Sequence, residues 1–235
     1  MQKKYEFTGE TKTWSGITLR RIRFMRDCTL KCGFEIHKGD LGGWIEKEDN
    51  LSQEDSAWVS GDAMVFGGAR VSGDAWVGGN AQVFGYAKVY GGVMVYGNAR
   101  VYVNAQVSGD ARIYGNAAVG DNAEVSGNAE VCGNAKVIGD ARIYGNATVY
   151  GNAVVSGDAK VSKSSDVIWF KNIWSSGRSF TYTRSNQKWK VGCFYGAGEE
   201  LIKKAYADSE LSGKCYEAIV EAVEKIYGAM KKAGK

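Results

Sequence analysis

A six-residue pattern of small, apolar and turn-forming positions repeats eighteen times between residues 57 and 164. The unit is Ala-x-Val-x-Gly-Asp/Asn. Its third position is Val or Ile in all eighteen units, and its fifth position is Gly in fifteen. Ala and Val lie two residues apart, so they point to the same face of an extended chain, and the two x residues point to the other face. Gly followed by Asp or Asn ends the strand, because both tolerate the left-handed backbone of a sharp turn.

Three such strands and three turns close a triangular coil of eighteen residues, so the array predicts a parallel β-helix of six coils. Each coil hydrogen-bonds to the coils above and below it, Val or Ile fills the interior, and Ala fits near the corners. At about 4.8 Å per coil, the prism is roughly 30 Å long. The outer x positions are the only ones free to vary.

The segments on either side of the array are expected to cap it. An open end of a parallel ladder exposes unpaired backbone groups and an apolar cross-section. Residues 1–56 predict an N-terminal hairpin, with strands at 4–7 and 17–24. An irregular first coil follows at 44–56, where Ile45 and Leu51 keep the six-residue spacing.

Residues 165–235 predict a C-terminal α+β domain. Strands at 167–174 and 180–183 form a hairpin around Ser175-Ser176-Gly177-Arg178, and a third strand runs over 189–194. Helices are expected at 197–207 and 213–231. An apolar stripe on the second helix either packs on the hairpin or makes a coiled-coil-like contact with another subunit. The stripe consists of Tyr216, Val220, Val223, Tyr227 and Met230.

Outward positions three hexads apart share one face of the prism, and two of the three faces are aromatic. The first face carries Trp58, Trp76, Met94, Tyr96, Tyr114, Cys132 and Tyr150. The second carries Met64, Phe66, Phe84, Tyr102, Ile138 and Val154. The third is polar and basic, with Arg70, Lys88, Tyr90, Glu124, Arg142, Tyr144 and Lys160.

Aromatic surface of this extent indicates an interface, because Tyr, Trp and Met are enriched where proteins meet. Self-association as a trimer of parallel prisms is one interpretation. The terminal segments folding back over the prism is another. A third is an aromatic platform that stacks nucleobases beside Arg and Lys. Tyr side chains in register also stack on one another, so part of the aromatic content is expected to be structural.

Composition excludes several classes of protein. The 235 residues carry a formal charge of +4, which does not by itself indicate sequence-specific nucleic-acid binding. Five scattered cysteines without a CxxC motif predict reduced thiols in a cytoplasmic protein, and indicate neither a disulfide framework nor a zinc site. No apolar run suits a signal peptide or a membrane span, so no membrane partner is expected.

The hexads resemble the left-handed parallel β-helix of the bacterial hexapeptide-repeat superfamily. The stretch Gly42-Gly43-Trp44-Ile45, with Asn50-Leu51 and Trp58-Val59 after it, is similar to the first coil of members described as acyltransferases. The C-terminal stretch, with Trp169-Phe170 and Gly192-Cys193-Phe194-Tyr195-Gly196, resembles a small domain of bacteriophage and prophage proteins. The resemblance implies a left-handed helix, frequent homotrimers and a phage-type accessory role, but no defined activity.

The chain departs from the acyltransferases of that superfamily at the catalytic group. Those enzymes use a histidine base beside a loop extruded from the helix, whereas the only histidine here is His37, outside an array that has no insertion. The superfamily's carbonic anhydrases need three histidines on zinc. No nucleotide-binding, serine-hydrolase or zinc-protease motif occurs. No catalytic residue, metal ligand or cofactor is therefore expected.

We expect a non-enzymatic binding protein in the cytoplasm of a host cell, with copies of itself as partners. It would sequester a small anionic, nucleotide-like signal or a host protein, as a counter-defence factor does. The alternatives are an acyltransferase that uses His37 and a purely structural scaffold or spike element. The candidate binding residues are Trp58, Trp76, Tyr96, Tyr114, Arg70, Lys88, Arg142 and Tyr144.

Overall fold

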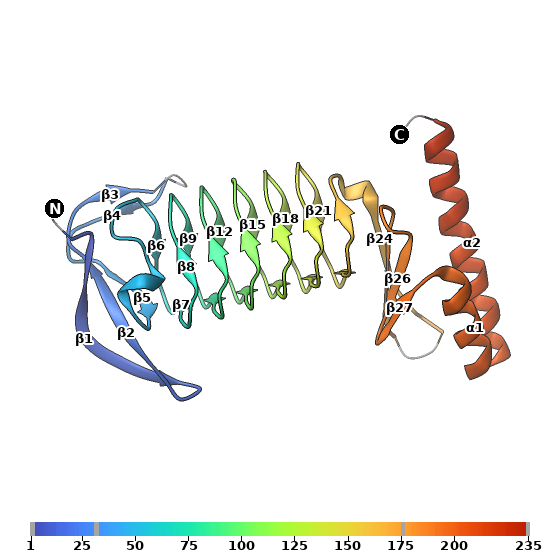
Figure 1. The fold of residues 1–235 in the computed structure, drawn as a ribbon, viewed down its shortest axis with the longest axis horizontal. Coiled ribbons are helices and arrows are strands. Elements are labelled where there is room, and N and C mark those ends of the chain that lie inside the picture. The colour runs from blue at the N-terminus through green and yellow to red at the C-terminus, as the bar shows by residue number, and fades with distance from the viewer. Residues whose placement is uncertain (1–2, 31–32, 175–176, 234–235) are drawn as a thin grey trace.

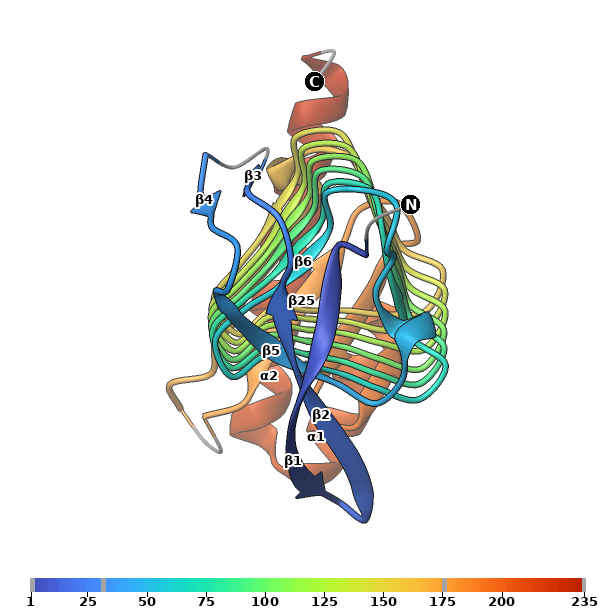
Figure 2. The ribbon, with the colours of Figure 1, turned by 90° about the vertical axis from the view of Figure 1, so that its left-hand side faces the viewer.

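The computed structural model describes residues 3–30, 33–174 and 177–233, and shows a long three-sided prism with a cap at each end (Figure 1). The prism is the left-handed parallel β-helix that the hexads predict. It has about seven coils, because the irregular first coil adds one to the six regular coils. Viewed along the axis, successive coils superimpose on one triangular outline (Figure 2).

Each face of the prism is a sheet of two-residue strands in the order that the repeat predicts. The first face contains β6 (Trp58–Val59), β9 (Trp76–Val77), β12 (Met94–Val95), β15 (Arg112–Ile113), β18 (Glu130–Val131) and β21 (Thr148–Val149). The second contains β7 (Met64–Val65), β10 (Gln82–Val83), β13 (Arg100–Val101), β16 (Ala118–Val119), β19 (Lys136–Val137) and β22 (Val154–Val155). The third contains β8 (Arg70–Val71), β11 (Lys88–Val89), β14 (Gln106–Val107), β17 (Glu124–Val125), β20 (Arg142–Ile143) and β23 (Lys160–Val161).

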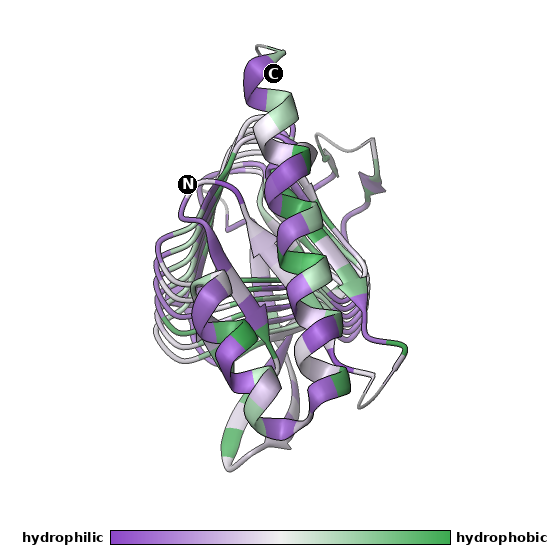
Figure 3. Cartoon of the chain, turned by 90° about the vertical axis from the view of Figure 1, so that its right-hand side faces the viewer, coloured by the Kyte–Doolittle hydropathy of each residue, from purple (hydrophilic) through white to green (hydrophobic). Residues whose placement is uncertain are grey.

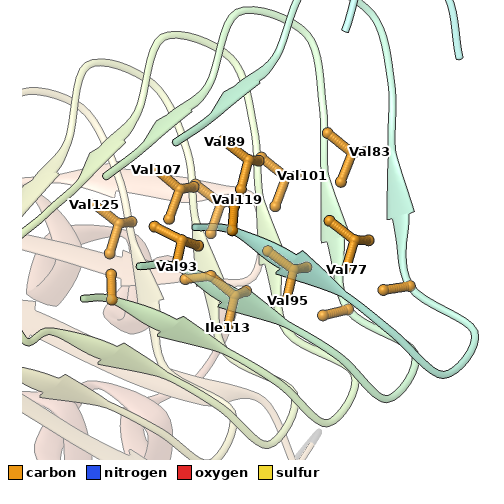
Figure 4. Close-up of a cluster of buried hydrophobic side chains, with 14 of the residues drawn as sticks. Val77, Val83, Val89, Val93, Val95, Val101, Val107, Ile113, Val119 and Val125 are labelled. Atoms are coloured by element: carbon orange, nitrogen blue, oxygen red, sulfur yellow. The ribbon is translucent and has the colours of Figure 1, made fainter. Parts of the chain in front are cut away.

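Backbone hydrogen bonds between coils hold the prism together. The amide of Arg112 donates to the carbonyl of Ala129 at 2.9 Å, and the amide of Tyr114 donates to Val131 at 3.0 Å, as their equivalents do in other coils. The Val and Ile side chains between these strands meet along the axis, where they are fully buried (Figure 4). The hexad Ala residues are fully buried as well.

The corners need the glycines of the repeat. Gly109 has a φ of 71°, and a Cβ atom added to it would lie 2.7 Å from the backbone nitrogen of Gly127 in the next coil. Val103 and Asp121 replace Gly at two successive turns of one corner, yet they adopt the same conformation, with φ of 60° and 56°. The geometry of the coil thus overrides the preference of Val and Asp for a negative φ.

The N-terminal cap extends the second face by one parallel strand, with an antiparallel hairpin beyond it. Its strands are β1 (Tyr5–Trp14), β2 (Ile17–Phe24), β3 (Cys28–Thr29), β4 (Glu35–Ile36) and β5 (Leu41–Ile45), followed by the short 3-10 helix η1 (Glu48–Asn50). Strand β1 extends to Trp14 and is therefore longer than the strand predicted at 4–7. The irregular first coil is confirmed, since Ile45 lies opposite Val65 and Leu51 bridges Val71.

Side chains of this cap donate hydrogen bonds to backbone carbonyl groups at the open end of the ladder. The ammonium of Lys4, which is fully buried, donates to the carbonyl of Ala57 at 2.7 Å. The side-chain amide of Asn50 donates to the backbone carbonyl of Ala69 at 2.8 Å. On the remaining face the carbonyl of Ala63 accepts from the backbone amide of Trp44 at 2.9 Å. Each face therefore starts with a satisfied acceptor.

The C-terminal end mirrors this arrangement with hydroxyl groups. In the last coil, one strand amide on each face has no further coil to donate to, and a Ser or Thr oxygen accepts from it. The pairs are Thr148 N to Ser164 Oγ at 3.0 Å, Val154 N to Thr181 Oγ1 at 2.9 Å, and Lys160 N to Ser185 Oγ at 2.7 Å. The C-terminal segment is thus bonded to all three faces.

That segment forms an antiparallel sheet with two helices on it. Its elements are η2 (Ser164–Asp166), β24 (Val167–Lys171), β25 (Ser179–Thr183), β26 (Lys188–Val191), β27 (Phe194–Gly196), α1 (Gly198–Asp208) and α2 (Glu210–Lys232). The predicted turn at Ser175-Ser176 lies outside the described residues. The predicted third strand instead breaks at Gly192, with a φ of 56°, and continues as β27. Helix α2 begins earlier than predicted, because the hydroxyl of Ser209 caps it by accepting from the amide of Ser212.

The apolar stripe of α2 packs within the chain. Tyr216 and Tyr227 are 8 % exposed, and the stripe shares a core with Phe180 and Trp189 of the sheet. Apolar residues of α2 alternate with polar ones along the helix (Figure 3). Of the two interpretations of this stripe, the structure shows packing on the C-terminal sheet. No helix in the described part of the chain combines the length and apolar character that crossing a membrane requires.

The inward position of the hexad gives the first testable prediction. Val107→Asp would place an unpaired charge in the axis of the prism, so we expect it to lose more than about 4 kcal/mol of stability. Gln106→Asp is the matched control, because Gln106 precedes Val107 in β14 but is exposed. Denaturant unfolding of both variants measures the difference, and equal melting would refute the inside-outside assignment.

The buried Lys4 gives a second prediction. Burial lowers the pKa of Lys4 from 10.5 to about 8, in spite of Asp55, which acts in the opposite direction. The unfolded chain therefore binds more protons than the folded chain between pH 8 and 10.5, so the folded state gains stability as the pH rises through this window. From pH 8 to pH 10.5, the wild-type free energy of unfolding should therefore rise by up to about 3 kcal/mol relative to that of Lys4→Met.

Urea unfolding across this pH range measures the effect, and Lys3→Met serves as the control, because the Lys3 side chain is exposed. Parallel pH profiles for the wild type and Lys4→Met would contradict the buried, proton-losing role of Lys4.

Candidate functional site

A stacked line of aromatic rings runs along the first face. The ring centroids of Trp76 and Tyr96 are 5.8 Å apart, and those of Tyr96 and Tyr114 are 5.1 Å apart at an interplanar angle of 4°. Phe34 of the N-terminal cap extends the line, with its ring 5.2 Å from that of Trp76. We call these four residues the aromatic strip. Three of the candidate residues are therefore brought together.

The strip is only partly covered by the chain. The rings of Trp76, Tyr96 and Tyr114 are half-buried, and Phe34 is 56 % exposed. The spacing of the rings follows the coil repeat, so each ring covers part of the face of the next. The strip therefore presents ring edges and part of the ring faces to the outside as a ridged apolar surface.

The polar groups along the strip are the phenols of Tyr96 and Tyr114 and one ion pair, Arg112–Glu130. Burial raises the pKa of the Tyr96 phenol above its usual range. A hydrogen bond with the thiol of Cys132, and then burial, raise the pKa of Tyr114. The Tyr114 hydroxyl lies 3.3 Å from Glu130, which also pairs with Arg112 at 3.5 Å. Both phenols therefore remain protonated at neutral pH.

Trp58, the first candidate of this face, does not belong to the strip. It is only 3 % exposed, and its ring meets that of Phe24 edge-on at 4.3 Å under the N-terminal cap. Trp58 also lines a cavity of about 360 Å³, together with Phe34 and Trp76. Sequence periodicity placed Trp58 on the correct face but gave no sign that the cap covers it.

The basic candidates lie on a different face. Arg70, Lys88 and Arg142 occupy one column of the third face, and Tyr144 lies beside it, 41 % exposed. Arg142 approaches Glu124 at 3.5 Å, as a solvated ion pair does. A corner of Asp and Asn residues separates this column from the first face. The candidate residues therefore do not form a single basic-plus-aromatic surface.

The second face carries its own aromatic stack, most of it covered at one end. Phe66 and Phe84 are 5.1 Å apart, and Phe84 and Tyr102 are 5.5 Å apart. Phe66 is buried among Leu19 and Trp44 of the N-terminal cap. The terminal segment thus folds back over this end of the second face, which was one of the three interpretations of the aromatic surface.

The structure also forms a groove that the sequence did not indicate. It lies where the second face meets β25 and β26, and has a volume of about 440 Å³. Lys136, Arg178 and Lys190 line it from three separate segments. No local motif connects these residues, because their proximity depends on how the C-terminal sheet docks on the last coils. We call it the basic groove.

Groups suited to catalysis or metal binding are sparse in the described chain. His37 is exposed, and its backbone amide donates to the carboxylate of Asp40 at 2.7 Å within a turn. Among residues 3–30, 33–174 and 177–233, no three His, Cys, Asp or Glu side chains gather in a way that would hold a metal ion. Four cysteines of this part are free thiols; Cys32 lies outside it.

Comparison with known protein families finds similarity in the repeat array alone. A family model described as the YdcK beta solenoid repeat matches residues 57–73, 95–109, 105–121 and 141–157. The chain is a β-solenoid repeat protein. All of these matches lie within the hexads of the β-solenoid, so they concern the prism and neither cap. A search of curated proteins found no match to this chain.

Proposed function

We propose that this β-solenoid protein is a non-enzymatic binding protein that holds its partner on the aromatic strip. The observation that carries the proposal is the strip itself, a line of partly exposed Phe, Trp and Tyr rings that runs from the N-terminal cap over successive coils. Residues of these types are enriched at protein interfaces and dominate their binding energy. A neutral phenol edge beside the Arg112–Glu130 pair suits the polar rim of such an interface.

The partner that the strip fits best is a second copy of the chain. The terminal segments form hydrogen bonds with backbone groups of all three faces at both ends of the prism, which disfavours end-to-end stacking. Association is therefore lateral. In a homotrimer of parallel prisms around a threefold axis, the strip of each copy lies along a neighbouring copy. We propose this assembly.

The biological role in this proposal is sequestration. The clefts of an assembled trimer hold a small anionic, nucleotide-like signal or a host protein without transforming it. Such a role suits a phage or prophage protein acting against host defence in the cytoplasm. The supports are the formal charge of +4 and the aromatic surface.

Assembly through the strip is tested by charge insertion. Trp76→Glu combined with Tyr96→Glu should lower the molar mass measured by light scattering to that of one chain, because two carboxylates would be desolvated in the interface. The melting temperature should change little, since both side chains are half-exposed. The matched control is Tyr90→Glu combined with Tyr144→Glu on the third face, which should keep the assembled mass. An unchanged mass in the strip variant would place the interface elsewhere.

Sequestration is tested separately, by calorimetric titration of the wild type with a panel of mono-, di- and cyclic nucleotides. The proposal predicts that at least one member binds and raises the melting temperature, because a ligand bound only by the folded state stabilises it. Titration calorimetry that detects no binding by any member would remove the nucleotide form of the proposal and leave assembly to be judged on its own result.

A further inference from the structure

The basic groove lies at the C-terminal end of the prism. Figure 1 shows the junction there between the last coils and the β24–β27 sheet. Lys136 and Val154 contribute from the second face, and Asn134 and Asn152 from the adjoining corner. The remaining lining comes from the C-terminal sheet and its turns, with Arg178, Ser179, Lys190 and Gly192. Its volume of about 440 Å³ is within the range of small-molecule sites.

The three cations of the groove have no carboxylate partner among the described residues, whereas several other cations do. Arg112, Arg142 and Arg184 each lie within 4.0 Å of a carboxylate. No described residue forms such a pair with Lys136, Arg178 or Lys190, and none of the described lining residues is acidic. Positive charges gathered without carboxylates repel one another, so an anion between them is favourable.

An asparagine ladder adds a directed donor to the same place. Along one corner, each Asn amide donates to the carbonyl oxygen of the next, and the last of these bonds runs from Asn134 to Asn152 at 3.2 Å. The earlier members are Asn80, Asn98 and Asn116. The side-chain oxygen of Asn152 is therefore used, whereas its NH2 group donates to no described residue, and Asn152 itself lines the groove.

The walls of the groove are held by the capping contacts. The amide of Val154 donates to the hydroxyl of Thr181 at 2.9 Å, which ties the last coil to β25. Lys190 lies opposite Thr181 in the next strand of that sheet. The side chain of Arg178 passes over Gly192, where an added Cβ would lie 3.2 Å from its Cδ. The capping bond thus places Lys190 beside the last coil, and Arg178 lies against Gly192 at the edge of the same sheet.

We propose that the basic groove binds a small phosphate-bearing anion through its phosphate groups. The Arg178 guanidinium suits bidentate contact with phosphate oxygens, and Lys136 and Lys190 act as point charges. The Asn152 NH2 group donates to a further oxygen. Two linked phosphates match the several donors better than a single one, so pyrophosphate is the preferred simple probe. The site is separate from the aromatic strip and does not require it.

Calorimetric titration at low ionic strength tests the site with inorganic phosphate, pyrophosphate, ATP and adenosine. Pyrophosphate and ATP should bind, and adenosine should not. Lys190→Gln and Lys136→Gln should each weaken pyrophosphate binding at least tenfold. Arg100→Gln is the matched control for Lys136, because both cations hold the second position of a hexad on the second face and are exposed, but Arg100 does not line the groove. It should bind as the wild type does.

The asparagine donor has its own matched pair. Asn152→Leu should weaken pyrophosphate binding, whereas Asn146→Leu should not, since Asn146 ends a ladder at a different corner. Thermal melting of each variant verifies that it folds. Failure of the wild type to bind pyrophosphate, binding of ATP without pyrophosphate, or an equal loss in Arg100→Gln would overturn the proposal. The strip variant should bind pyrophosphate normally, so failure of assembly leaves this result intact.

Discussion

Hydrogen bonding between successive coils is the constraint on which the rest of this structure depends. Before the last coil, the outward residue of each strand donates its backbone amide to the next coil, as Arg112 does to Ala129, so the repeat length is fixed along the array. An inserted residue would move Val and Ile from the axis to the surface, because side chains alternate between faces. Recognition is therefore confined to the outward positions and the two ends, where the sequence can vary without breaking the ladder.

The ends show how strict this constraint is. A ladder that stops must satisfy one set of carbonyls at its start and one set of amides at its finish, and the protein uses side chains for most of them. Lys4 and Asn50 donate at the start, and Ser164, Thr181 and Ser185 accept at the finish. A buried lysine is costly on its own, but here its ammonium replaces a backbone donor that no coil supplies. The same docking of the C-terminal sheet creates the basic groove.

The array, its inward residues and the membership of each face follow from the sequence, because a strict period leaves only one register. The candidate site follows only in part. Tyr96 and Tyr114 stack because they lie one coil apart, and Trp76 joins them from the other outward position of its hexad in the preceding coil. Trp58 lies one coil before Trp76 and is nevertheless covered by Phe24, which no periodicity reveals. The basic groove was not predictable, because Lys136 meets Arg178 and Lys190 only through tertiary docking that has no local signature.

The central claim is that this prism binds laterally through its aromatic strip, with a copy of itself as the partner. Native mass spectrometry of the unmodified protein tests that claim most directly. The account predicts a dominant species of three times the 25.5 kDa chain mass, with or without a small anionic adduct. A single-chain mass at every protein concentration would contradict it.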